Sequence, residues 1–192
     1  MKILTIQQIE ELFKPISQEA KNIVIGNKQL DGLMSTSNEI EVKIHYDDGD
    51  VYCLFQQLQK AYPWGGLGIL SKTKIFILIK DSSIELSIKP IKKFPWLRGS
   101  KSYKITSNVL DIKKNLEEDK NLLDSLSDIP FVSFSTSNKL PSQSFNYESP
   151  SFLLFSSDHI IKNTSHIKNI LEIFKLLLVF LNKFNRHQHV KK

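Results

Sequence analysis

Two apolar-rich runs on either side of an Asp-Gly pair most constrain how this chain folds. Residues 42–46 alternate apolar and polar side chains, residues 51–55 are continuously apolar, and Asp48-Gly49 lies between the two runs. Such a pair between two strand-like runs predicts an antiparallel hairpin with a two-residue turn. One face would then be apolar, and the other would carry Glu41, Lys43 and His45. The expected partners are Tyr46 with Val51, Ile44 with Cys53 and Val42 with Phe55.

A second hairpin is predicted further along the chain. Residues 75–79 and 84–88 are rich in isoleucine and flank a polar Asp81-Ser82 turn. The other face of the first of these strands carries Phe76 and Leu78, so we expect it to be covered on both sides. The expected partners are Ile79 with Ile84, Ile77 with Leu86 and Ile75 with Ile88. Residues 67–70 and 103–106 are predicted to add shorter strands.

Helical spacing of apolar residues appears in three places. Thr5 and Gln8 form a Thr-x-x-Gln capping box for a first helix that Pro15 should end near Lys14. A middle helix of about 18 residues is predicted over 109–126, capped by Ser107 or Asn108. A last helix is predicted over 164–184.

The order of elements indicates an α+β protein. Residues 131–134 and 152–155 are predicted to be two further strands, joined by a polar loop over 138–150. Because strands and helices do not alternate regularly, we expect a mostly antiparallel sheet built from hairpins. An N-terminal helix, a middle helix and a long C-terminal helix would pack on it. Residues 1–185 are predicted to form a single domain, followed by a basic C-terminal tail over 186–192.

Composition limits the class of protein. The chain has 192 residues, 41% hydrophobic and 24% charged, which is typical of a soluble globular domain. A single cysteine, Cys53, excludes an internal disulfide and any metal site made of several cysteines. Residues 1–5 lack the pattern of a signal peptide, so we expect a cytoplasmic location. The longest apolar run of the last helix has six residues, which is too short to span a bilayer.

Positive charge is concentrated in one segment. Residues 72–104 hold nine basic and two acidic residues, a net charge of +7, whereas the whole chain carries +6. Two aromatic-Pro-Trp segments, with Trp64 and Trp96, flank its central hairpin. The predicted binding residues in this segment are Lys89, Lys92, Lys93, Trp96, Arg98, Lys101 and Lys104. They could bind a phosphate-bearing surface, either nucleic acid or a membrane face, but such a charge run is more often a solvated face that keeps strand ends soluble.

Residues typical of catalysis are scattered. Asp158 and His159 follow a predicted strand and are the leading acid–base candidates, with His45 and Glu85 as weaker ones. Residues 47–50, Asp-Asp-Gly-Asp, have too few oxygens for a calcium loop and fit a turn better. Cys53 is expected to be buried and inert. We predict no metal and no cofactor.

The sequence therefore favours a non-enzymatic binding or accessory module that acts through a protein partner or an anionic surface. The alternative is an enzyme whose site is assembled from scattered residues such as Asp158 and His159. A homo-oligomer formed through the wide apolar face of the last helix is a further possibility: 12 of the 18 residues over 167–184 are apolar.

Overall fold

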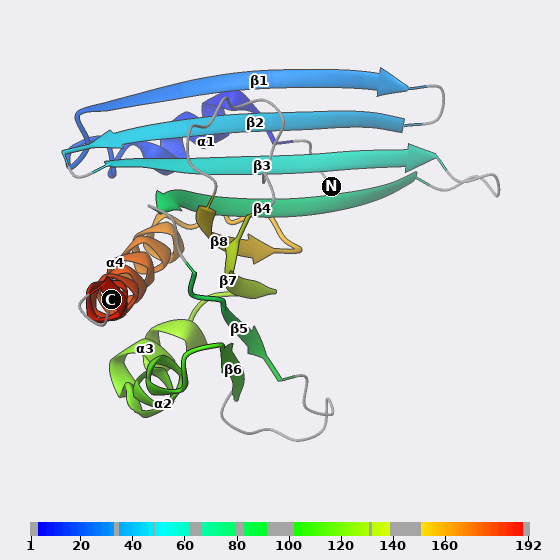
Figure 1. Cartoon of the computed structure of the whole chain (residues 1–192). Helices are drawn as coiled ribbons and strands as arrows, with labels where there is room; N and C mark the ends of the chain where they lie inside the picture. The colour runs from blue at the N-terminus through cyan, green and yellow to red at the C-terminus, as the bar shows by residue number, and fades with distance from the viewer. Residues whose placement is uncertain are drawn as a thin grey trace.

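The computed structural model places eight strands of the described chain in one antiparallel sheet, with the order β1-β2-β3-β4-β8-β7-β5-β6 (Figure 1). The strands are β1 (Asn22–Gly32), β2 (Ser35–Tyr46), β3 (Gly49–Ala61), β4 (Leu67–Ile79), β5 (Leu86–Pro90), β6 (Tyr103–Ser107), β7 (Ser133–Ser137) and β8 (Ser151–Ser157). The helices are α1 (Ile6–Phe13), α2 (Leu110–Glu118), α3 (Lys120–Ser127) and α4 (Thr164–His189). The structure describes residues 4–32, 35–47, 49–61, 67–79, 83–91, 102–130, 132–138 and 151–189. An α+β fold with an antiparallel sheet is thus confirmed.

The main core lies between one face of the sheet and the helices. Apolar residues at alternate positions of the strands form one cluster with the buried residues of all four helices. Phe134 of β7 is fully buried between Phe155 of β8 and Phe174 of α4, with ring centroids 5.1 and 5.9 Å away. These edge-to-face contacts fix α4 against the middle of the sheet. We call this side of the sheet the helix face. The other side carries none of the described helices, although Tyr52, Phe76 and Phe152 form a second buried cluster on it, and we call it the open face.

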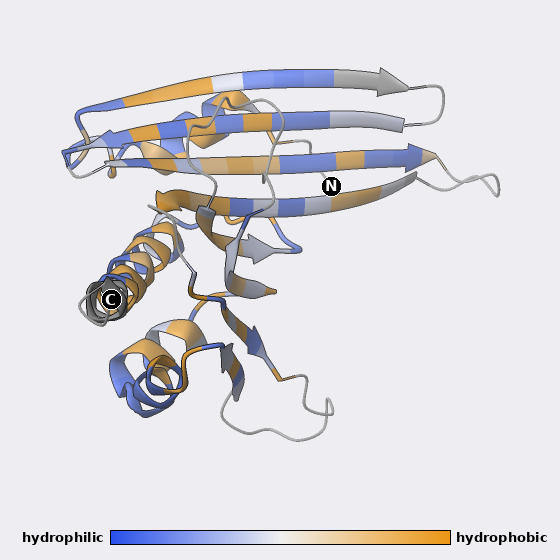
Figure 2. Cartoon of the chain, in the orientation of Figure 1, coloured by the Kyte–Doolittle hydropathy of each residue, from blue (hydrophilic) through white to orange (hydrophobic). Residues whose placement is uncertain are grey.

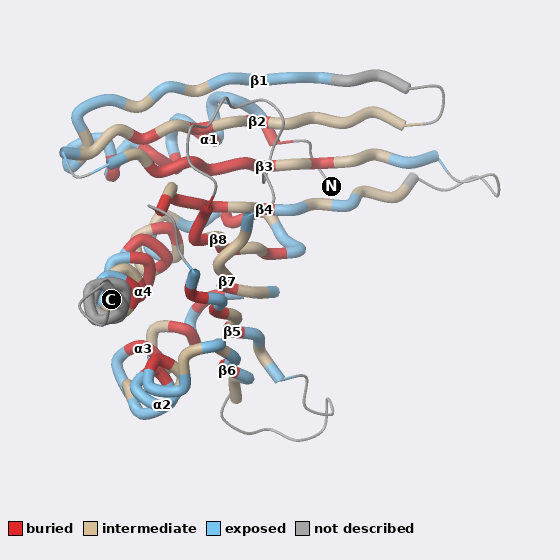
Figure 3. Tube along the Cα trace, viewed as in Figure 1, coloured by how far each residue is buried: buried red, intermediate tan, exposed pale blue. Residues whose placement is uncertain are grey.

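The first four strands extend beyond the core. Buried residues are concentrated in one half of β2, β3 and β4, while the other half is mostly intermediate or exposed (Figure 3). Hydropathy falls in the same direction along β1 and β2, whereas β4 is apolar again toward its far end, at Ile69 and Leu70 (Figure 2). On the helix face, the apolar rows give way to a row made of Gln29, Asn38, Gln57 and Ser71. Leu4 closes this end of the core: its amide donates to Gln57 Oε1 (2.5 Å), and its carbonyl accepts from Asn38 Nδ2 (3.1 Å).

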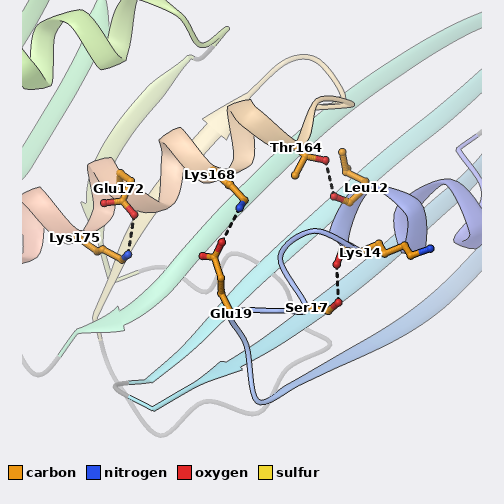
Figure 4. Close-up of polar contacts among 8 residues, drawn as sticks. All are labelled: Leu12, Lys14, Ser17, Glu19, Thr164, Lys168, Glu172 and Lys175. Carbon is orange, nitrogen blue, oxygen red and sulfur yellow. Dashed lines mark hydrogen bonds and ion pairs between the residues drawn. The ribbon is translucent and has the colours of Figure 1, made fainter.

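The N-terminal segment is also tied to the last helix. The Thr164 hydroxyl, at the start of α4, donates to the carbonyl of Leu12 (2.8 Å), and Lys168 Nζ lies 2.6 Å from Glu19 Oε1 (Figure 4). The pKa of Glu19 is lowered by the hydrogen bond and the charge of Lys168. The Thr5–Gln8 capping box and the end of α1 at Phe13, before Pro15, are as predicted.

The first hairpin keeps its predicted faces, but its register is wrong by two residues. Tyr46 pairs with Gly49, and Ile44 pairs with Val51. A shift of two residues preserves which side chains share a face, so the hydrophobic pattern could not distinguish the two registers. The observed register places Asp50 opposite His45 rather than opposite Asp47, and this avoids a pair of like charges.

The second predicted hairpin is wrong. β4 pairs with β3 and β8, while β5 pairs with β6 and β7, so two strands lie between β4 and β5. The expected burial on both faces is nonetheless present. Phe76 is fully buried on the open face, stacked on Tyr52 at 5.2 Å and packed against Phe152.

Four further features differ from the prediction. β1 was not predicted. The middle helix is two helices, α2 and α3, because Asp119 has extended backbone angles and caps α3 by accepting from the amide of Leu122. Val109, not Ser107 or Asn108, is the N-cap of α2. α4 continues to His189, five residues past the predicted end and into the predicted tail. Trp64 and most of the 138–150 loop lie outside the described residues.

Candidate functional site

Strand register places the described lysines of the basic segment on the open face of the sheet. Lys89 of β5 and Lys104 of β6 are cross-strand partners, and both are exposed. Lys72 and Lys74 lie on β4, where Lys74 alternates with the buried, inward-facing Thr73 and Ile75. The other predicted binding residues, Lys92, Lys93, Trp96, Arg98 and Lys101, lie outside the described residues.

A single transverse row connects Lys74, Lys89 and Lys104 across five strands. Lys74 pairs with Ser156 of β8, and Ser156 pairs with Ser133 of β7. β7 pairs with β5 through Phe134 and Ile88, so the next position along sets Lys89 beside Ser133. Strands lie about 4.8 Å apart, and the row therefore spans roughly 19 Å. We call this set the lysine–serine row: Lys74, Ser156, Ser133, Lys89 and Lys104.

The row combines positive charge with hydroxyl groups. Burial, followed by the charge of Lys72, lowers the pKa of the half-buried Lys74, whereas Glu39 acts in the opposite direction. A bound anion would stabilise this ammonium group. Ser156 and Ser133 are partly buried between the lysines, and each hydroxyl can donate a hydrogen bond. The row is thus suited to phosphate oxygens.

A polar groove of about 660 Å³ lies beside the row, where β5, β6 and β7 meet. Ser87 lies in its middle, because Ser87 pairs with Ser135 on one side and Thr106 on the other. Most of the groove is lined by hydroxyl and amide side chains, and Glu85 is its one ionisable residue among the described lining residues. Asn108 holds the Glu85 end: its side chain accepts from the Glu85 amide (2.9 Å) and donates to the Ser83 carbonyl (2.8 Å).

The predicted acid–base pair is not assembled into a site. Asp158 and His159 are both exposed, and no hydrogen bond between their side chains is present in the described chain. His159 contributes to the fold through its backbone: its carbonyl accepts a hydrogen bond from the Thr73 hydroxyl (2.8 Å). Glu85 and His45, the weaker candidates, lie in separate regions of the sheet.

His45 belongs to a polar cluster that sequence reasoning missed. His45 Nδ1 lies 2.7 Å from Asp50 Oδ1, while Lys43 Nζ lies 2.9 Å and the Tyr52 hydroxyl 3.3 Å from Asp50 Oδ2. Burial alone would raise the pKa of Asp50, but hydrogen bonds and charges from Lys43 and His45 outweigh it and lower the pKa. The hydrogen bond to Asp50 raises the pKa of Lys43. The sequence signal for this cluster was polar residues two apart on each side of the turn, Lys43 and His45 before it and Asp50 and Tyr52 after it. Only the correct strand register shows that these residues are neighbours.

Among the described residues there is no candidate metal site, no reactive cysteine and no membrane-spanning helix. No group of three or more His, Cys, Asp or Glu side chains in the described ranges could hold a metal ion. Cys53 is buried on the helix face, as predicted, and burial raises the pKa of its thiol far above the usual range. No helix in this part of the chain is long and apolar enough to cross a membrane.

Comparison with known proteins gives no relative. No protein-family model, curated protein or solved structure matches this chain.

Proposed function

We propose that this protein is a non-enzymatic binding module that docks on a phosphate-bearing polyanion through the open face of its sheet. The observation that supports the proposal is the lysine–serine row. It places three lysines and two serine hydroxyls on one line across β4, β8, β7, β5 and β6.

The length of the row favours an extended ligand. A single phosphate would contact the adjacent Lys89 and Lys104, whereas Lys74 lies three strands from Lys89, about 14 Å away. A polymer or surface with several phosphates could engage both ends. Lysine acts as a point charge and does not provide the planar fork of arginine, so such binding would be insensitive to base sequence.

The charges around the row favour the same ligand. Glu39 and Glu41 lie on β2, two strands beyond Lys74, and β8 and β7 contribute only serines to the row. Glu85, in the polar groove, lies four residues along β5 from Lys89. Among the described residues the row itself therefore contains no carboxylate to compete with phosphate.

The test compares two double variants with equal changes in net charge. K89E/K104E reverses both exposed lysines of the row, and K114E/K120E reverses two exposed lysines on α2 and α3. A 30-residue polythymidylate and vesicles containing phosphatidylserine are the two probes. We expect at least tenfold weaker binding for K89E/K104E and less than a twofold change for the control.

The salt dependence provides a second readout. With the single-stranded probe, losing two phosphate contacts should reduce the slope of log K against log salt by about 1.4. Binding to polythymidylate but not vesicles would identify a nucleic-acid ligand, and the reverse would identify a lipid surface. Equal losses in both double variants would refute a specific role of the row, as would no binding to either probe.

A further inference from the structure

The first strand has a long backbone edge that no other strand of the described sheet pairs with. β1 has 11 residues and is the last strand of the sheet on its side, so no described strand pairs with its outer edge. The opposite edge strand, β6, has only five residues, including Lys104. Proteins usually protect long edges with proline, bulges or several lysines. Between Asn22 and Gly32 there is no proline and one lysine, Lys28, and the Val24 side chain is 51% exposed.

A groove with an apolar floor runs beside this edge. It measures about 620 Å³ and lies between α1 and β1. Ile23 and Ile25 of β1 are partly exposed and form its floor, and Phe13 of α1 also lines it but is almost fully buried. Glu10 and Glu11, both exposed on α1, line it together with a single lysine, Lys14. The volume lies within the range of about 300–1,000 Å³ that is typical of ligand pockets.

The groove and the edge are placed to act together. Ile23 and Ile25 point toward the helix face, because they pair with the buried Ile44 and Val42. A strand added to the edge would lie about 4.8 Å outside β1. Every second side chain of that strand would point to the same side as Ile23 and Ile25, over the groove.

We propose that β1 is the docking edge for an extended segment of a partner protein, which adds to the sheet as a further strand. Its backbone would hydrogen-bond to the outer edge of β1, and alternate side chains would enter the groove, apolar over Ile23 and Ile25 and lysine or arginine beside Glu10 and Glu11. Main-chain bonds give affinity in this mode of recognition, and pockets for alternate side chains give specificity. This inference is independent of the lysine–serine row.

Charge argues for a basic partner rather than a second copy of this chain. Two antiparallel β1 strands in a continuous sheet are related by a twofold axis perpendicular to the sheet. Both α1 helices would then lie on the same side, with Glu10 and Glu11 of one copy facing those of the other. Like charges brought together in this way oppose association.

The test uses a defined peptide. The probe is the acetylated and amidated nine-residue peptide TLTKTLTKT, which carries leucine and lysine on one alternate face and threonine on the other. Two N-methylated forms each lack one alternate set of backbone donors. If the peptide adds to β1, only the set that faces β1 is needed, so one form should bind like the parent and the other should lose binding. Amide hydrogen exchange over 22–32 should slow on binding.

Charge reversal gives the matched variants. E10K/E11K should bind the lysine peptide about tenfold more weakly, and it should bind the glutamate version TLTETLTET more tightly than the wild-type protein does. The control E118K/D124K makes the same charge change at exposed positions of α2 and α3 and should leave the affinity within twofold. Equal binding of both N-methylated forms, or slowed exchange only outside β1, would overturn the proposal. So would protection of β1 in a peptide-free dimer, which would identify a second copy as the occupant.

Discussion

The hydroxyl of Thr73 connects the middle of the sheet to the segment that leads into α4. Thr73 is fully buried on β4. Its Oγ1 donates to the carbonyl of His159 (2.8 Å) and accepts from the amide of Ile161 (3.1 Å). Two backbone groups of a non-helical segment therefore depend on one side chain. Replacing Thr73 with valine keeps the shape of the side chain and removes both bonds.

The cost of T73V follows from those two groups. A buried backbone amide or carbonyl left without a partner costs about 1–3 kcal/mol. The loss of the bond to the Ile161 amide should account for most of this cost, because that bond is buried, whereas the bond to the His159 carbonyl is only partly buried. We therefore expect T73V to lower the free energy of unfolding by about 2–4 kcal/mol, a large share of the 5–15 kcal/mol typical of a domain.

Urea denaturation followed by circular dichroism measures this loss. T106V is the matched control, because the Thr106 hydroxyl makes one long, exposed bond to the Ser87 carbonyl (3.4 Å), and we expect less than about 0.5 kcal/mol there. T73S keeps the hydroxyl and should retain most of the stability that T73V loses. The reasoning fails if T73V costs no more than T106V, or if T73S costs as much as T73V.

Three further outcomes are expected. Because the pKa of Asp50 is lowered in the folded state, the stability that Asp50 contributes should be present above its ordinary pKa of 3.8 and disappear as the pH falls further. Acid unfolding of D50N should lack this component, with D47N, which removes an exposed carboxylate, as the control. The buried Cys53 thiol should react with Ellman's reagent only as fast as the protein opens, in contrast to rapid labelling in urea. Removing the N-cap of α3 with D119A should lower the free energy of unfolding by about 1 kcal/mol, measured by thermal unfolding. D124A removes an exposed aspartate of α3 that caps no helix, and an equal cost for the two variants would contradict the capping role of Asp119.

Features determined by neighbours in the sequence were predictable. The Thr5–Gln8 capping box depends on residues three apart, and the helix ends where proline removes a backbone donor. The alternation in residues 40–46 determines which side chains of β2 face the core, and the Asp-Gly turn extends that assignment to β3, even though neither can fix the register. Both signals are local, so no knowledge of the rest of the fold was needed.

Features determined by distant segments were not predictable. β1 lies at an edge of the sheet and buries little. On its helix face only Ile23 and Ile25 give an apolar signal, because the next two residues on that face are Asn27 and Gln29. The second hairpin was inferred because 75–79 and 84–88 are adjacent in sequence and equally apolar. In the structure β4 pairs with β8 and β5 pairs with β7 instead, and both partners come from more than 40 residues later in the chain.

The insertion of β8 and β7 also changes how the basic segment should be understood. In the sequence, +7 is concentrated within 33 residues. In the fold, β4 is separated from β5, and the serines of β8 and β7 lie between Lys74 and Lys89. Lys74 is thereby held about 14 Å from Lys89, at which distance exposed charges are largely screened at physiological salt. The separated lysines cannot share one small anion, but each can contact a different phosphate of an extended ligand. Free inorganic phosphate should therefore compete only weakly with polythymidylate or a lipid surface, and efficient competition at millimolar phosphate would show that Lys89 and Lys104 act alone.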